Sequence, residues 1–367
     1  MSWLALLALL GWAYLALLHG RFWQAGPVLV PTEPMRAASV AAVVPARDEA
    51  TVIGASVGSL LAQDYAGGFH VVLVDDGSAD GTADIARGLG GARLAVIAGT
   101  PRPAGWAGKL WAVQQGVAAA GDAEWLLLTD ADIVHDRRHV ATLVAQAERS
   151  GADMVSEMVA LNCSSAAERA LVPAFVYFFQ MLYPFARVND PASRIAAAAG
   201  GTILVRRETL ARVGGIAAIK GALIDDVALA ASVKRIGRIW LGHSGLARSI
   251  RPYPDFADIW RMIARSAYVQ LRYSPLLLAG TTFGLALLFV VPPAAAVTGH
   301  WPGLAAWAVM AATFLPTLRR FRLSPLRAPL LPLAALFYMA ATLGSALDHH
   351  RGRGVVWKNR AYTERQA

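Results

Sequence analysis

Apolar residues are concentrated at the two ends of this chain and leave a more polar middle. One uninterrupted apolar run covers residues 3–18, and three further segments follow at residues 275–297, 301–318 and 328–347. A helix that crosses a bilayer needs ~20 apolar residues, a length that these segments approach or reach. Charged residues make up only 16% of the chain, whereas soluble domains contain about a quarter. The sequence therefore predicts a membrane protein whose polar middle folds outside the bilayer.

Basic residues near the first apolar run predict the orientation of the chain. No basic residue precedes this run and no small-residue cleavage site follows it, so we interpret it as a retained anchor and not as a signal peptide. Arg21 and Arg36 follow the run, and the positive-inside rule then places the polar middle in the cytoplasm. We expect a multi-pass protein of the inner membrane with this cytoplasmic orientation.

The third C-terminal segment leaves two topologies open. Crossings by the two preceding segments place the basic loop at residues 319–327 in the cytoplasm, as the charge rule favours. A third crossing through residues 328–347, which Pro329 and Pro332 interrupt, would place the basic tail outside. Either this segment is re-entrant or interfacial, or the tail is an exception to the rule.

The net charge of +9 and the cysteine content limit the partners and the kinds of site. Many arginines flank apolar segments, a placement that suits anionic lipid head groups better than a nucleic-acid groove. We therefore expect a membrane as partner and no nucleic acid. The single cysteine, Cys163, excludes an intrachain disulfide and any multi-cysteine metal site.

The middle of the chain has the pattern of an α/β domain, because apolar runs of strand length alternate with stretches of helical spacing. This alternation predicts a mostly parallel sheet with helices on both faces. We expect strands at residues 40–44, 71–74, 94–97, 125–128, 153–161 (at the edge of the sheet) and 200–205. We expect helices at residues 50–63, 82–89, 108–120, 138–149, 166–186 and 225–236. The aromatic helix at 166–186 is either interfacial or part of the core.

These patterns divide the chain into five parts. They are an N-terminal transmembrane anchor, a linker, an α/β domain, C-terminal transmembrane or re-entrant helices, and a basic tail. Their predicted ranges are residues 1–20, 21–39, 40–274, 275–347 and 348–367.

Two aspartates with one residue between them, Asp130 and Asp132, directly follow the apolar strand at 125–128. Ligands of open α/β sheets bind outside the carboxyl ends of the strands. Two carboxylates at this edge can hold a hard divalent cation that also carries a diphosphate. Such a pair taken alone is more typical of a turn after a strand, so its interpretation as a cation site depends on the other motifs.

Four further motifs lie where a predicted strand ends or a helix begins. Each has an ordinary structural explanation as a turn or a helix-terminal acid. Each can also serve a nucleotide or its reaction, through carboxylates that accept hydrogen bonds, a lysine at a helix N-terminus that suits an anion, or an aspartate that acts as general base. The motifs are residues 44–49 (VPARDE), 74–82 (VDDGSADGT), 105–109 (GWAGK) and 224–226 (IDD).

Two common nucleotide-binding classes are disfavoured by what the motifs lack. No Gly-x-Gly-x-x-Gly follows the first strand, which argues against a nicotinamide-dependent dehydrogenase. The pair Gly108-Lys109 lacks the upstream glycine of a Walker A loop, so an ATPase is not supported.

In this order, and with residues 200–206 (Gly-Gly-x-x-x-x-Arg) before the acidic pair, the motifs resemble those of the inverting family-2 glycosyltransferases of the GT-A fold. The resemblance covers residues 40–275, about two-thirds of the chain. The apolar ends, the stretch 224–229 (IDDVAL) and residues 270–274 (QLRYS) are most similar to glycosyltransferases associated with hopanoid biosynthesis, which in turn are similar to ceramide glucosyltransferases.

The resemblance implies a role for each motif. Asp130 would face the sugar and nucleotide, and with Asp132 it would hold a divalent cation, Mg²⁺ or Mn²⁺. Asp226 would be the catalytic base that deprotonates an acceptor hydroxyl. The nucleotide sugar would further be bound by Pro45, Arg47, Glu49, Asp75, Asp76, Lys109 and Asp225.

The chain departs from the family at the Gln/Arg-x-x-Arg-Trp motif that is expected before the C-terminal apolar segments. Arg261 and Arg265 are spaced one residue too far apart and no tryptophan follows them. Gln270 and Arg272 are spaced one residue too close, and Tyr273 stands in place of the tryptophan. By resemblance Arg265, Gln270, Arg272 and Tyr273 remain candidates for contacts with the nucleotide sugar, with anchoring at the membrane interface as the alternative.

The sequence thus predicts a membrane-bound hexosyltransferase that moves a sugar from a nucleotide donor, with UDP as the first candidate, to a lipid hydroxyl. A hopanoid acceptor is implied by resemblance alone. The alternatives are a polyprenyl-phosphate sugar transferase, a polysaccharide synthase and, from another class, a non-catalytic membrane scaffold.

Overall fold

The computed structural model describes residues 1–24, 26–352, 355–357 and 360–362. The chain forms two compact units, each built from segments that are distant in sequence. We call them the α/β unit, with residues Pro27–Asn162 and Arg187–Arg251, and the helical unit, with residues Met1–Gly26, Cys163–Ala186 and Pro252–Val355. Two segments of the range 40–274, Cys163–Ala186 and the part that follows Pro252, thus group with the terminal helices. Nine of the twenty residues of the predicted basic tail, 353–354, 358–359 and 363–367, lie outside the described residues.

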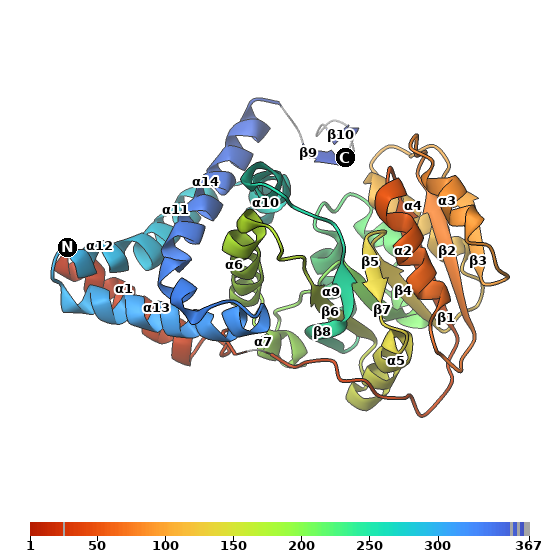
Figure 1. Ribbon diagram of the computed structural model, residues 1–367, viewed down its shortest axis with the longest axis horizontal. Helices are drawn as coiled ribbons and strands as arrows, with labels where there is room; N and C mark the ends of the chain where they lie inside the picture. The colour runs from red at the N-terminus through yellow and green to blue at the C-terminus, as the bar shows by residue number, and fades with distance from the viewer. Residues whose placement is uncertain (25, 353–354, 358–359, 363–367) are drawn as a thin grey trace. The chain divides into compact units, whose positions relative to one another are not determined.

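The α/β unit is built on one eight-stranded sheet with the order β3-β2-β1-β4-β7-β6-β8-β5 (Figure 1). Its first four strands in this order run parallel to one another, as predicted, whereas β7 is antiparallel to both β4 and β6, and β5 is antiparallel to β8. The strands are β1 (Val40–Ala46), β2 (Phe69–Asp75), β3 (Leu94–Ala98), β4 (Trp125–Thr129), β5 (Ile133–His135), β6 (Met154–Ala160), β7 (Thr202–Arg206) and β8 (Ile239–Ser249).

Strand β1 shows why the parallel strands form the core. All seven of its residues are buried, and a continuously apolar strand suits a sheet that is covered on both faces. Its neighbours are in register, with Val43 opposite both Val72 of β2 and Leu128 of β4. The carboxyl ends of β1, β2 and β4 therefore meet at one edge of the sheet, where Arg47, Asp76 and Asp130 follow them.

The predicted position of β6 at the edge of the sheet is wrong. Strand β6 pairs with β7 on one side and with β8 on the other. We did not predict β8, because its segment contains two glycines and two serines among eleven residues and lacks the β-branched run of a typical strand. Its pairing with β6, from Met154 opposite Ile239 onward, is a tertiary contact that local pattern does not encode.

Helices cover both faces of the sheet. Alternate residues of β1 point to opposite faces, and Val44 belongs to a core cluster with residues of α2 and α5, whereas Val43 lies under Gly116 of α4. The main helices of the unit are α2 (Ala50–Leu61), α3 (Thr82–Gly88), α4 (Gly108–Ala119), α5 (His139–Ser150) and α9 (Asp225–Lys234). Shorter ones are α7 (Phe185–Asn189), α8 (Arg207–Arg212) and the 3-10 turn η1 (Ile216–Ile219). The main helices lie within two residues of their predicted ends.

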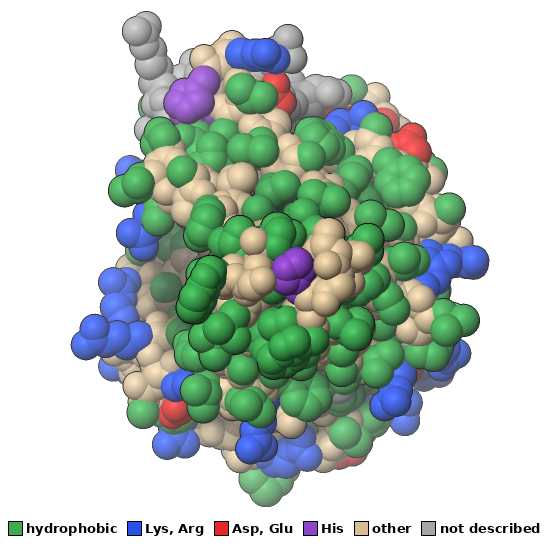
Figure 2. Space-filling view, turned by 90° about the vertical axis from the view of Figure 1, so that its left-hand side faces the viewer, with side chains coloured by type: hydrophobic (Ala, Val, Ile, Leu, Met, Phe, Trp, Pro, Cys, Tyr) green, Lys and Arg blue, Asp and Glu red, His purple; other side chains and the backbone are tan. Residues whose placement is uncertain are grey.

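The helical unit consists of long apolar helices and two amphipathic ones. Helix α1 packs against α12, α13 and the turn before α12, and in that turn the carbonyl of Leu288 accepts a hydrogen bond from the indole N–H of Trp12 at 2.6 Å. Figure 2 shows apolar side chains gathered on one face of the molecule. The elements are α1 (Ser2–Leu17), α6 (Ala166–Leu182), α10 (Phe256–Gln270), α11 (Pro275–Leu285), the π-helical turn η2 (Ala286–Val290), α12 (Val291–Val297), α13 (Trp301–Arg320), η3 (Pro325–Leu330) and α14 (Leu331–His350).

Among the described residues of this unit, three helical segments are long and apolar enough to cross a membrane. They are Pro275–Val297, Trp301–Arg320 and Pro325–His350, judged by length and composition. Helix α1 has 16 residues and is shorter than these.

Of the two alternatives for the aromatic helix, the structure favours a core helix. Helix α6 ends at Leu182, four residues earlier than predicted, because Pro184 disfavours helical backbone at the residue before it. Tyr177 is fully buried and its hydroxyl hydrogen-bonds with Thr313 at 2.7 Å. Phe178 is also buried, edge-on to Phe289 and Tyr338.

The contact of α4 with the sheet gives a test of how tightly this core is packed. A methyl group added at Gly116 would lie 2.4 Å from Val43 and 3.1 Å from Val74. We expect Gly116→Ala to destabilise the α/β unit by about 1–3 kcal/mol through overpacking. Gly58→Ala on α2 is the matched control, because its methyl group meets nothing within 4 Å and alanine favours a helix by roughly 0.5–1 kcal/mol. Thermal unfolding should show a lower Tm for the first variant and an unchanged or higher Tm for the second.

Candidate active site

An open pocket of about 370 Å³ lies at the carboxyl edge of the parallel strands. Pro45 lies near the end of β1, Asp130 follows β4, and Gly200 lies just before β7. Lys109 at the start of α4 and both acids at the start of α9 also line it. The pocket therefore collects residues from four of the five predicted motifs in one place.

Lys109 connects two of these motifs through ion pairs. Its Nζ lies 2.9 Å from a carboxylate oxygen of Asp130 and 3.2 Å from one of Asp225. Burial alone disfavours the ammonium, but the two carboxylates outweigh it and raise the pKa of Lys109, so the amine stays protonated. Asp225 thus pairs with Lys109, and the N-terminus of α9 has no side-chain cap.

Asp226 is the acid of the pocket whose protonation changes near neutral pH. Burial and the neighbouring Asp225 carboxylate raise the pKa of Asp226 to about 7, against the opposing effect of Lys109. Its Oδ1 accepts a hydrogen bond from the N–H of Val227 at 2.8 Å. Its Oδ2 would lie 3.1 Å from a methyl group at Gly200, so the glycine lets the backbone approach this carboxyl closely.

Asp130 is less acidic than an exposed aspartate, although Lys109 pairs with it. Burial raises the pKa of Asp130, and the Asp132 carboxylate adds to this effect. Asp132 is itself almost buried, with 11% of its side chain exposed. Four carboxylates from two motifs therefore share this region with a smaller number of cations, which favours the binding of a further cation.

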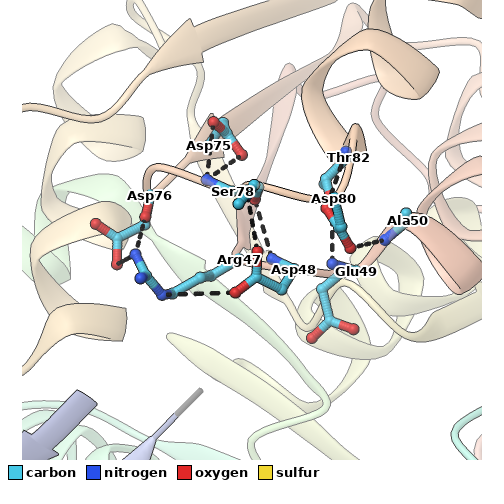
Figure 3. A network of polar contacts seen from close by, with 10 residues as sticks. Arg47, Asp48, Glu49, Ala50, Asp75, Asp76, Ser78, Asp80 and Thr82 are labelled. Carbon is cyan, nitrogen blue, oxygen red and sulfur yellow. Dashed lines mark hydrogen bonds and ion pairs between the residues drawn. The ribbon is translucent and has the colours of Figure 1, made fainter. Parts of the chain in front are cut away.

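The loops after β1 and β2 are held together by their own polar residues (Figure 3). The Arg47 guanidinium donates to the backbone carbonyl of Asp76 and lies 3.7 Å from its carboxylate. The Asp48 carboxylate accepts from the N–H of Ala79 at 2.9 Å, and Asp80 accepts from the N–H of Ala50 at 2.9 Å.

Asp75 in the same loops has a local role. Both oxygens of its carboxylate accept from the N–H of Ser78 at 3.4 Å, which braces the turn at Gly77. The φ of +68° at Gly77 is a backbone conformation that favours glycine. Predicted nucleotide-binding residues thus form one polar surface beside the sheet, and their backbone is fixed by the acids between them.

Glu49 and Asp132 are brought together by a residue that we did not predict. Arg251, just after β8, donates to Glu49 at 2.6 Å, and its Nε lies 3.4 Å from an oxygen of Asp132. Ser249 donates to the same Asp132 oxygen at 2.6 Å. Neither residue belongs to a recognisable motif, and both follow from the course of β8, which local pattern does not reveal.

Comparison with protein-family models adds an identification to this geometry. Residues 41–214, just under half of the chain, match the model described as Glycosyl transferase family 2. This segment is a family 2 glycosyltransferase domain. It makes the chain an enzyme of the glycosyltransferase class. The matched residues include Lys109, Asp130 and Asp132, whereas Asp225, Asp226 and Arg251 lie beyond them. A comparison with curated protein sequences finds no match.

One solved structure of a glycosyltransferase shares the fold, and others are less similar. The mannosyltransferase PcManGT from Pyrobaculum calidifontis, in complex with GDP-Man and Mn²⁺, is 20% identical, with a TM-score of 0.59 over 94% of this chain and 99% of its own. TarS 1–349 of S. aureus in complex with UDP-GlcNAc is 15% identical, with a TM-score of 0.44 over 87% and 93%. Glucosyl-3-phosphoglycerate synthase from Mycobacterium tuberculosis, with Mg²⁺ and UDP, is 17% identical, with a TM-score of 0.40 over 61% and 75%. The first likeness places the sheet of the glycosyltransferase domain in the GT-A fold.

The acids of the glycosyltransferase domain fit a divalent cation only together with a substrate. Within residues 1–24, 26–352 and the short pieces beyond, no three His, Cys, Asp or Glu side chains form a group that could hold a metal ion. Mg²⁺ and its relatives need only one or two carboxylates when phosphate oxygens of a substrate complete the shell. Asp130 and Asp132 supply hard oxygen ligands of this kind, so the residues present fit a cation that arrives with a diphosphate.

The remaining predicted site residues belong to the helical unit. Arg265 is exposed on α10, and Gln270, the last residue of α10, donates to the hydroxyl of Tyr183 at 2.6 Å. Arg272 and Tyr273 have positive φ angles of 52° and 55°, and the ring of Tyr273 stacks on His349 at 4.4 Å. Their role in the glycosyltransferase stays a prediction.

Replacing Lys109 tests the charge balance of the pocket. We expect Lys109→Met to raise the pKa values of Asp130 and Asp226, because Lys109 lowers both. A carboxyl group with a higher pKa in the folded state than in the unfolded state destabilises the protein as the pH rises from the unfolded-state pKa to the folded-state pKa. The Tm of the variant should therefore fall further below that of the wild type as pH rises from 5 to 8, by several degrees at the upper end. A Tm difference that is independent of pH would contradict this electrostatic role.

Proposed function

We propose that this glycosyltransferase moves a sugar from a nucleotide donor to a hydroxyl group of a lipid, with inversion at the anomeric carbon, at the cytoplasmic face of the inner membrane. The observation that carries the proposal is the position of Asp226. Its carboxyl lines the same pocket as Lys109 and Asp130, with a pKa raised to about 7 by burial and by Asp225. A general base works best when its pKa lies near the operating pH.

The donor would bind along the carboxyl edge of the sheet. Pro45, Arg47, Glu49, Asp75 and Asp76 would contact the base and ribose, since the two loops that hold them form one polar surface. Lys109 and Asp225 would lie near the diphosphate and the sugar. A UDP-sugar is the first donor to test. A GDP-sugar is the second, because PcManGT is described in complex with GDP-Man.

Asp130 and Asp132 would hold Mg²⁺ or Mn²⁺, which when bound neutralises negative charge on the leaving diphosphate. Lys109 provides a fixed positive charge on the Asp130 side of the pocket. This charge does not depend on solvent reorganisation, which is the feature that makes preorganised electrostatic groups effective in catalysis.

The chemical step would be one displacement. Asp226 accepts the proton of the acceptor hydroxyl, whose oxygen forms the new bond to the anomeric carbon. The bond between that carbon and the diphosphate oxygen breaks, and its electron pair leaves with the nucleoside diphosphate. Because the acceptor attacks from the face opposite the leaving group, the anomeric configuration inverts.

Three features of the chain support a lipid acceptor. The helical unit contains three segments that are long and apolar enough to cross a membrane, and α1 adds a fourth apolar helix. An acceptor dissolved in a bilayer requires an enzyme that is held at the bilayer. The resemblance of the stretches at 224–229 and 270–274 to hopanoid-associated enzymes makes a hopanoid, or another polycyclic or sphingoid lipid, the class of acceptor to test first.

Replacing the base distinguishes a hydroxyl acceptor from a phosphate acceptor. We expect Asp226→Asn to lower the rate of transfer by about 10²–10⁴-fold, because a hydroxyl needs a base whereas a lipid phosphate does not. In the wild type kcat/KM should rise as pH rises through about 7, since only the ionised carboxylate accepts a proton. Mass spectrometry of membrane lipids should find a glycolipid in cells with the wild type that is missing in cells with the variant. Full activity of the variant would favour a polyprenyl-phosphate acceptor.

Contacts within the helical unit support a membrane position in which α14 does not cross the bilayer. Helix α10 packs along α14: Trp260 contacts Phe337 edge-on and lies over Gly344. The hydroxyl of Ser345 donates to the carbonyl of Ala264, and the hydroxyl of Tyr268 lies 3.3 Å from Nε2 of His350. The contacts therefore run from residue 337 to residue 350 of α14.

The charges of α10 argue against a span by the helix that packs on it. Arg261, whose side chain is 70% exposed, pairs with Asp258, and Arg265 is exposed on the same helix. Charged side chains are costly in the hydrocarbon core. Residues 325–336, which precede these contacts, are too few for a span of ~20 residues. We propose that α14 lies in the interface and that the chain crosses the bilayer only before residue 321.

Cysteine labelling tests this topology. In a Cys163→Ser background, we expect a cysteine at Ala257, exposed at the start of α10, and a cysteine appended after Ala367 to be on the same side of the membrane. Both should react with a membrane-impermeant maleimide only after cells are permeabilised, as the cytoplasmic orientation requires. Labelling of the C-terminal cysteine alone in intact cells would mean that α14 crosses the bilayer.

A further inference from the structure

Arg251 is the cationic partner of Asp132 in this structure. Its Nε lies 3.4 Å from Oδ2 of Asp132, and its Nη2 donates to Oε1 of Glu49 at 2.6 Å. The Asp132 side chain is 11% exposed and that of Glu49 is 9% exposed, so neither carboxylate is well solvated by water. A nearly buried carboxylate requires a neighbouring positive charge or hydrogen bonds, and Arg251 supplies both.

We propose that Arg251 is a positioning residue that occupies Asp132 until a divalent cation binds, and that it competes with this cation for the carboxylate. The inference rests on the proposed function, because it assumes that Asp132 is a ligand of the cation. It goes beyond it by assigning a role to a residue that lies outside the matched family domain and outside every motif of the sequence.

The two acids of the motif have separate counter-charges, which makes Arg251 specific for one of them. Asp130 pairs with Lys109, whereas Asp132 pairs with Arg251 and accepts from Ser249 at 2.6 Å. Both the guanidinium and the hydroxyl contact Oδ2, so they hold the carboxylate in one orientation. A cation that binds Asp132 adds two positive charges beside this guanidinium, and the mutual repulsion weakens the hold of Arg251 on Asp132.

Glu49 gives Arg251 a second partner that does not depend on Asp132. The backbone N–H of Glu49 donates to Oγ1 of Thr82 at 2.8 Å, which ties this residue to the loop after β2. When the cation takes Asp132, the guanidinium can therefore stay on Glu49, at the end of the polar surface proposed for the donor. Arg251 would in this way connect occupation of the cation site with the loops that contact the nucleotide.

Mn²⁺ binding in the presence of a nucleoside diphosphate measures this competition. In purified full-length enzyme, titrated with Mn²⁺ at a fixed concentration of UDP and followed by electron paramagnetic resonance, we expect Arg251→Gln to bind the ion more tightly, on the order of tenfold, because a neighbouring positive charge is removed. Removing a residue that only supports the fold would weaken the site, so a gain in affinity is not a result of structural damage. Arg251→Lys, which keeps the charge, should bind Mn²⁺ much more like the wild type.

Two further variants make the result interpretable. Arg248→Gln removes the same charge from an exposed position of β8 and should leave Mn²⁺ affinity unchanged, which separates the local contact from net charge. Asp132→Asn should abolish the binding and so identifies the site. If the wild type binds Mn²⁺ and Arg251→Gln binds it no more tightly, the proposed competition is wrong. The proposed cation site is then not affected. If the wild type binds no Mn²⁺ in the presence of either UDP or GDP, both the competition and the proposed cation site are wrong.

Discussion

The ion pairs of Lys109 are the interaction on which the candidate site depends. One ammonium group lies within 3.2 Å of carboxylates that belong to segments almost a hundred residues apart, Asp130 after β4 and Asp225 at the start of α9. Without this charge the pocket would bring several acids together with no compensation, and burial would favour their neutral forms. Because Lys109 begins α4, the close packing of α4 on the sheet at Gly116 also fixes the position of the charge.

The same rule applies to the other acids at this edge of the sheet. Arg47 lies beside Asp76, and Arg251 lies between Asp132 and Glu49. Asp76, Asp132 and Glu49 thus each have a basic partner from another segment. Asp226 differs, since its neighbour Asp225 raises its pKa and Lys109 only partly offsets this. The acid that is proposed to accept a proton is therefore the one with the least compensation.

In the helical unit, the environment of α14 depends on its contacts with α10, which combine apolar packing with a few polar groups. Helix α14 has a hydropathy that suits a span, and exposed leucines such as Leu333, Leu336 and Leu347 lie along it. Its other side contacts α10, whose charged residues belong in water or among head groups. The sequence left the third segment undecided because a third crossing conflicts with the positive-inside rule. Hydropathy counts only the residues of one helix, whereas the environment of that helix also depends on the helix beside it.

What the sequence by itself determined were features that depend on neighbouring residues. The apolar strands β1, β2 and β4, the helices between them and the acids just after the strands follow from local pattern, because strand and helix periodicities are short-range and parallel strands must place their carboxyl ends at one edge. The family of the domain could also be recognised from the order of these motifs. Only the tertiary structure decided the central position of β6, the existence of β8, the core position of α6 and the partners of Asp132. These depend on contacts between segments that are far apart in sequence, such as Arg251 with Glu49, and no local pattern specifies which distant residue supplies the opposite charge.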